Sequence, residues 1–149
     1  MLIQLLVGTA LIIACVVTHA ISLELLLRRL KAIAPRWDRR LPNYGHIIIM
    51  IVVVLGLFAA HSVEAWIWAL FYWLSGEVTT LSEAVYFSTV TYTTLGYGDI
   101  TLSPDWYITS SLQAVSGIIL FGWSTAFLVN VRAFFWKKYG LTHYQEYQG

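Results

Sequence analysis

The chain has 149 residues, of which 58% are hydrophobic, 15% are aromatic and 11% are charged, and its formal net charge is +1. This composition is too apolar for an ordinary soluble domain of that length and excludes that class. It indicates a protein of the lipid bilayer.

Three apolar runs approach or exceed the roughly twenty residues that cross the hydrocarbon core. They cover residues 2–21, 47–70 and 108–131. We therefore predict an all-α membrane protein with three transmembrane helices. The first run is predicted to remain as a membrane helix rather than a cleaved signal peptide, because no basic residue precedes it and apolar residues continue beyond Thr18-His19-Ala20.

The basic residues predict the orientation of the chain in the membrane. All nine lie in segments 28–40 and 132–138, and residues 73–105 carry acidic but no basic side chains. Because short basic loops stay on the cytoplasmic side, we expect the amino terminus outside and the carboxyl terminus inside.

Residues 1–27 are predicted to form an additional first helix. Glu24 and Arg28, four residues apart, can pair on one face of it. We expect His19 to be a neutral histidine that hydrogen-bonds to a neighbouring helix, although a functional role for this intramembrane group stays open. Cys15, the single cysteine, excludes an intramolecular disulfide and is expected to be a small buried hydrophobe.

The segment 28–44 is predicted to be a basic cytoplasmic linker, interrupted by Pro35 and Pro42. Its mixture of basic and apolar residues suits the headgroup layer beside anionic lipid. A topological anchor is the favoured interpretation, and a lipid-sensing gate is the alternative.

The second run ends in His61, Glu64 and a cluster of aromatic residues. His61 and Glu64 are three residues apart on one helix face, so they form either a proton-sensitive pair or a structural hydrogen bond. The aromatic cluster is interpreted first as a belt at the membrane boundary and second as packing for the outer loop. Its members are Trp66, Trp68, Tyr72 and Trp73.

A short helix is predicted to begin after Thr80. Thr80 and Glu83 have the spacing of a capping box. Residues 81 to about 93 are too few and too polar to span the bilayer, so we predict a re-entrant helix enclosed by protein. The partial negative charge at its carboxyl end would favour a cation in a central cavity.

The motif Thr94-Leu95-Gly96-Tyr97-Gly98-Asp99 follows this helix. Glycine adopts dihedral angles that other residues avoid, so the peptide planes can alternate and successive carbonyls can point the same way. Carbonyls in a row can replace the water around a dehydrated cation. The motif therefore predicts an ion-binding strand.

Residues 81–131, roughly a third of the chain, resemble the pore module of potassium channels, especially small prokaryotic ones. The usual filter of that family is Thr-Val-Gly-Tyr-Gly, and Leu95 stands here in place of its valine. The resemblance implies that Gly96 and Gly98 permit the unusual backbone, that Tyr97 faces away from the axis and that Asp99 stands at the outer mouth. It also implies K⁺ sites made by the carbonyls of Thr94, Leu95, Gly96 and Tyr97 and by the Thr94 hydroxyl. Because each site needs about eight oxygens, the pore module (45–131) is expected to assemble as a homotetramer.

Three positions in the filter and behind it depart from the family pattern. Where relatives commonly have two aromatic donors, this chain has Tyr86 and Phe87, and Phe87 cannot donate a hydrogen bond. Val90 stands where some relatives have glutamate, and Leu95 lacks the β-branch that stiffens valine. Selectivity could therefore be less strict than the motif suggests.

The third helix contains Gly117 and Gly122, either of which could bend to open an inner gate, while its small residues allow close helix packing. Residues 132–149 are expected to be a short cytoplasmic tail. It is too short for a nucleotide-binding or calcium-binding domain, so the gating stimulus is left open.

The favoured function is a potassium-selective channel in the plasma membrane of a bacterium. The alternatives are a cation channel of relaxed selectivity and a non-conducting membrane subunit. We expect no cofactor apart from permeant K⁺ and no nucleic-acid partner. An enzyme is disfavoured because the histidines show no metal-ligand or nucleophile–base spacing. They are His19, His46, His61 and His143.

Overall fold

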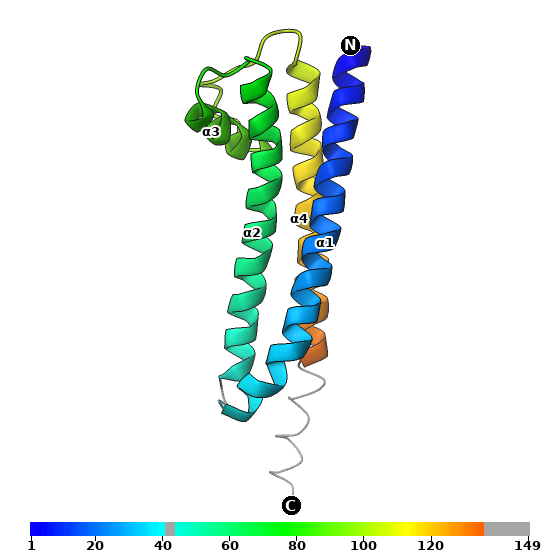
Figure 1. The fold of residues 1–149 in the computed structure, drawn as a ribbon, viewed down its shortest axis with the longest axis vertical. Helices are drawn as coiled ribbons and strands as arrows, with labels where there is room; N and C mark the ends of the chain where they lie inside the picture. The colour runs from blue at the N-terminus through cyan, green and yellow to red at the C-terminus, as the bar shows by residue number, and fades with distance from the viewer. Residues whose placement is uncertain (41–43, 136–149) are drawn as a thin grey trace, which may run out of the picture.

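A computed structural model describes residues 1–40 and 44–135. The described residues form four helices and no strand: α1 (Leu2–Arg40), α2 (Gly45–Leu74), α3 (Leu81–Tyr92) and α4 (Tyr107–Phe135). The three long helices lie side by side, and short α3 packs against one end of α2, on the side away from α1 (Figure 1). The amino terminus, the carboxyl end of α2 and α3 all lie at this end of the molecule.

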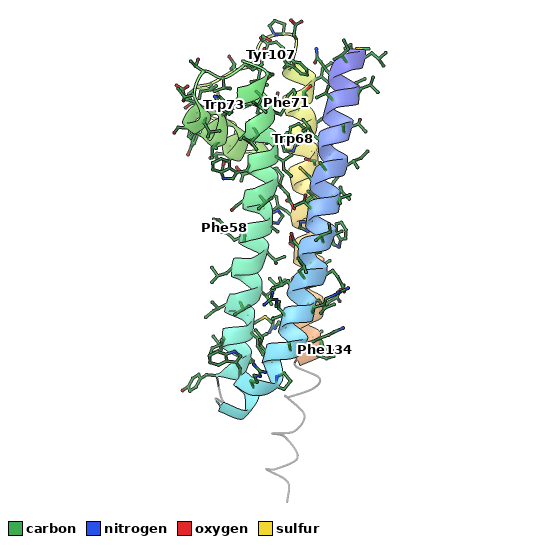
Figure 2. The ribbon with its side chains drawn as sticks, in the orientation of Figure 1. Phe58, Trp68, Phe71, Trp73, Tyr107 and Phe134 are labelled. Carbon is green, nitrogen blue, oxygen red and sulfur yellow. The ribbon has the colours of Figure 1, made fainter. Side chains whose placement is uncertain are left out.

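The three predicted long helices are present. The segments Leu2–Trp37, Gly45–Leu74 and Tyr107–Phe134 are long and apolar enough to cross a membrane. Large apolar side chains on their outer surfaces remain exposed in the single chain, as Phe58 does on the outer side of α2 (Figure 2). Such a surface suits contact with lipid or with other chains.

The basic segment differs from the prediction, because α1 runs through Pro35 and ends only at Arg40. A proline inside a helix removes one backbone hydrogen bond. Leu30 and Ala34 on the same face are buried against Ile49 and Val53 of α2, and this packing offsets part of that loss. Pro42 and the predicted tail from residue 136 onward lie outside the described residues.

The aromatic cluster of α2 divides between two roles. Trp68 and Tyr72 are fully buried, whereas Trp66 and Trp73 are 45% and 41% exposed. The belt interpretation is therefore wrong for Trp68 and Tyr72, which form core packing with Phe87 of α3. Cys15 is also fully buried in this core, as predicted.

Buried polar side chains connect α3 to its two neighbours. The Tyr72 hydroxyl donates to Gln113 Oε1 at 2.9 Å, and Gln113 Nε2 donates to Ser88 Oγ at 2.7 Å. Ser88 Oγ in turn donates to the carbonyl of Ala65 at 2.6 Å. Because removing one member would leave buried partners unsatisfied, this chain of bonds holds α3 in one position between α2 and α4.

The loops on either side of α3 are also tied together. The carboxylate of Glu77 accepts hydrogen bonds from the backbone N–H of Ser103 at 2.8 Å and from its hydroxyl at 3.0 Å. These two bonds join the residues before α3 to the residues after the glycine motif.

The first turn of α4 is bonded to α1. Gln4 of α1 accepts a hydrogen bond from the N–H of Ile108 at 3.1 Å and satisfies one free donor in that turn.

Candidate ion-conducting site

The beginning of α3 confirms the predicted capping box. The N–H of Glu83 donates to Thr80 Oγ1 at 3.2 Å, and the N–H of Thr80 donates to Glu83 Oε2 at 3.2 Å. Two backbone donors of the first turn are satisfied in this way. The cap sets where α3 begins, and α3 ends at Tyr92, directly before the glycine motif.

The backbone of the motif turns its N–H groups toward α3. The N–H of Thr94 donates to the carbonyl of Thr91 at 3.0 Å, and those of Leu95 and Gly96 donate to the carbonyl of Val90 at 2.9 and 3.2 Å. Among the described residues, the carbonyls of 94–97 accept no backbone hydrogen bond. The first three donors of the motif are therefore used inside the chain, and a row of acceptors is left available.

Left-handed backbone conformations occur at every second residue of the motif. The φ angles are +62° at Thr94, +54° at Gly96 and +78° at Gly98. Glycine adopts this region readily, whereas a threonine there carries a strain of about 1–3 kcal/mol. The sequence predicted the unusual backbone at the two glycines. The sequence did not indicate the left-handed conformation of Thr94, which is stabilised by the hydrogen bonds to the end of α3.

The motif is exposed in the single chain. All residues from 93 to 99 are exposed, including the side chains of Leu95 (56%) and Tyr97 (66%). A non-helical segment with unpaired acceptors and exposed apolar side chains needs further contacts to be satisfied in a membrane.

Of the three positions predicted to support the motif, Tyr86 and Val90 make hydrogen bonds to it, and Phe87 does not. The Tyr86 hydroxyl donates to Asp99 Oδ2 at 2.7 Å, and this bond raises the pKa of the Tyr86 phenol. Phe87 packs edge-on against Tyr72, with ring centroids 5.1 Å apart, and makes no polar contact with the motif. Val90 contributes its backbone carbonyl.

If residues 94–97 form a K⁺ path, Tyr86→Phe should lower the preference for K⁺ over Na⁺ and leave the thermal stability nearly unchanged. The exposed bond to Asp99 holds the outer end of the motif but adds little to the fold. Reversal potentials in liposomes measure this preference. Tyr107→Phe is the matched control, because it removes an exposed hydroxyl at the start of α4; an equal change in both variants would contradict the prediction.

The two glycines of α4 have different surroundings. A Cβ atom at Gly117 would lie 2.1 Å from the carbonyl oxygen of Tyr92, whereas one at Gly122 would meet nothing within 4 Å. Helix α4 continues through both positions. Gly117 therefore permits the close approach of α4 to the end of α3, and no described residue packs against Gly122.

The predicted pair of His61 and Glu64 belongs to a larger buried cluster. His61 Nδ1 lies 3.0 Å from Glu64 Oε2, and His19 Nδ1 of α1 lies 2.7 Å from Glu64 Oε1. The hydroxyl of Tyr92 donates to Glu64 Oε2, and Ser124 Oγ of α4 lies 2.8 Å from His61 Nε2. His19 contacts a neighbouring helix as predicted, but the sequence did not indicate Glu64 as its partner.

Two other predicted features have simpler outcomes. Glu24 accepts a hydrogen bond from Arg28 Nε at 2.7 Å on the exposed side of α1, where such a pair contributes little. Of the remaining histidines, His46 is exposed near the beginning of α2, and His143 lies outside the described residues.

The fold and the motif of the described residues together define a class: a helical membrane protein with three candidate spanning helices and a short helix that leads into an extended segment of free carbonyls. Residues 47–133, more than half of the chain, match the profile of the family described as "Ion channel". The chain belongs to this ion channel family. The matched residues include α2, α3, the motif and most of α4, and α1 lies before them. Comparisons with curated proteins and with solved structures gave no match.

Proposed function

We propose that the protein is a potassium-selective channel that conducts K⁺ passively across a membrane. One observation carries this proposal: the alternation of left-handed backbone at Thr94, Gly96 and Gly98 beside a row of unpartnered carbonyls. Carbonyl oxygens arranged in rings replace the hydration shell of K⁺. In this proposal the ion sites are made by Thr94, Leu95, Gly96 and Tyr97.

Four copies of the chain would be needed to surround each ion. One motif per chain offers too few oxygens for a site of about eight, and fourfold closed symmetry supplies the rest. The exposure of residues 93–99 supports this assembly, because neighbouring chains would cover the side chains of Leu95 and Tyr97. In such a homotetramer α3 is a re-entrant pore helix and Asp99 lies at the outer mouth.

The proposed setting is a bacterial plasma membrane, with the amino terminus outside. The basic residues near the far ends of α1 and α4 support this orientation, and they suit contact with anionic lipid headgroups. The concentration of acidic residues in the segment around the motif would raise the local concentration of cations.

The test is the reversal potential of the purified full-length protein in liposomes under opposing K⁺ and Na⁺ gradients. A reversal near the K⁺ equilibrium potential is the expected result. A reversal near zero would instead support a cation channel of relaxed selectivity, which the apolar packing of Phe87 favours. Absence of flux from a tetrameric protein under all conditions would contradict a channel and leave a non-conducting subunit. Protein-free liposomes are the control.

A further inference from the structure

The cluster around Glu64 joins all four helices. His19 comes from α1, His61 and Glu64 from α2, Tyr92 from α3 and Ser124 from α4. The side chains of His19 and Glu64 are 0% exposed and that of His61 is 12% exposed. Together the three offer ligand atoms of the kinds that bind metal ions, all within 4.8 Å of one another.

We propose that His19, His61 and Glu64 bind one divalent transition-metal ion of the Zn²⁺ type. Two imidazoles and one carboxylate form a ligand set that zinc uses in proteins. Nitrogen ligands disfavour Ca²⁺ and Mg²⁺, which prefer all-oxygen sites. The site does not depend on the proposed ion conduction.

The distances suit such an ion after a small movement. His19 Nδ1 and His61 Nδ1 lie 2.7 and 3.0 Å from the two carboxylate oxygens of Glu64. Tetrahedral ligands at zinc bond lengths of about 2.0–2.1 Å are about 3.3 Å apart. The two nitrogen–oxygen distances are a few tenths of an ångström shorter than this separation, and the three ligand atoms all lie within 4.8 Å of one another. Tyr92 Oη, 3.0 Å from His61 Nδ1, lies beside the same point and can complete the set.

The other ring nitrogens give an independent argument. His61 Nε2 and His19 Nε2 both face Ser124 Oγ, at 2.8 and 3.4 Å. If both Nδ1 atoms bind a metal, both Nε2 atoms carry a proton and donate to Ser124 Oγ, which can accept two hydrogen bonds. If two neutral imidazoles instead donate to Glu64 through Nδ1, both Nε2 lone pairs compete for the single proton of Ser124. A metal-free arrangement satisfies both rings only when His61 Nδ1 accepts from the Tyr92 hydroxyl instead of donating to Glu64. The metal-bound arrangement satisfies both rings without that change, and hydrogen bonds of this kind orient histidine ligands in metal sites.

The surroundings of Glu64 also favour a cation. In the part of the chain that the structure describes, the ion pairs of Glu64 are with His19 and His61, with no lysine or arginine among them. A buried carboxylate is strongly destabilised unless positive charge or hydrogen bonds compensate it. Without a metal, hydrogen bonds from Tyr92 and the two histidines compensate Glu64. A bound metal would add a full positive charge and would link α1 to α2.

The test uses the full-length protein in detergent after removal of metals with a chelator. Titration with Co²⁺ should produce the visible absorption bands of a low-symmetry Co²⁺ site at about one ion per chain, and Zn²⁺ should displace them. His19→Gln and Glu64→Gln should each weaken binding by tenfold or more. Ser124→Ala should weaken it by about ten- to a hundredfold without abolishing it, as loss of a partner of a ligand does. His46→Gln, an exposed histidine of the same helix as His61, is the matched control and should bind as the unchanged chain does.

A second measurement covers variants that fold poorly. Zn²⁺ should raise the thermal unfolding midpoint of the unchanged chain and of His46→Gln, because an ion that binds only the folded state stabilises it. At the same Zn²⁺ concentration, it should raise the midpoints of His19→Gln and Glu64→Gln by less. Folded unchanged protein that takes up no Co²⁺ or Zn²⁺ would overturn the proposal and assign the cluster to hydrogen bonding alone. Equal binding by the unchanged chain and His19→Gln would overturn it as well.

Discussion

Gly96→Ala is expected to abolish K⁺ flux while the helices remain folded. Alanine at the φ of +54° found at Gly96 costs about 1–2 kcal/mol in each chain. In a tetramer the four costs sum to about 4–8 kcal/mol at one ring of carbonyls. Because each 1.4 kcal/mol is a factor of ten, the conducting conformation should fall about three to six orders of magnitude in population. Flux assays on liposomes containing equal amounts of folded protein measure this loss.

Gly76→Ala is the matched control for that substitution. Gly76 has a φ of +77°, and a Cβ there would meet nothing within 4 Å, as at Gly96. The variant carries a similar backbone cost in the loop before α3, outside the motif. It should conduct K⁺ once folded. Normal flux through Gly96→Ala, or equal loss in both variants, would contradict the assignment of residues 94–97 as the ion path.

Gly117→Ala is expected to destabilise the protein by about 1–3 kcal/mol, the usual range for overpacking a core. Its Cβ would lie 2.1 Å from the carbonyl oxygen of Tyr92, and neither atom belongs to a flexible side chain. Either α4 or the end of α3 must move. Since the motif begins two residues after Tyr92, flux should fall as well. Thermal unfolding followed by circular dichroism, together with liposome flux, measures both effects.

Gly122→Ala, in the same helix, helps to distinguish a packing role of Gly117 from a role in bending α4. A Cβ there has open space, and alanine stabilises a helix interior by up to about 1 kcal/mol relative to glycine. Its stability should be equal or higher. If Gly117→Ala unfolded at the same temperature as the unchanged protein and altered only channel opening, Gly117 would act as a hinge, and the packing explanation would be wrong.

The sequence predicted the elements well because their signals are local. Apolar length indicated the three long helices, and the spacing of Thr80 and Glu83 indicated the beginning of α3. The course of α1 through Pro35 was missed, because it depends on packing of Leu30 and Ala34 against α2. The burial of Trp68 corresponds to the second of the two interpretations and not to the favoured one, since composition alone cannot show which face of α2 meets α3.

Of the contacts around Glu64, the sequence predicted only the one between residues that are close together in the chain. His61 and Glu64 lie one helical turn apart, so their contact followed from spacing. His19 and Ser124 come from helices far away in the chain, and no periodicity pairs them with Glu64. The conformation of Thr94 was equally inaccessible, because its φ of +62° results from hydrogen bonds to the end of α3 and not from the residue type.

The exposure of residues 93–99 in a single chain has a consequence for biosynthesis. In the proposed homotetramer, a newly inserted chain supplies one side of the ion path, and the other three subunits supply the remaining sides. Single chains then conduct no ions, and the ion conductance of the membrane rises steeply, rather than linearly, with the number of copies made. A cell could synthesise the protein slowly without dissipating its membrane potential, and ion flow would begin when subunits meet.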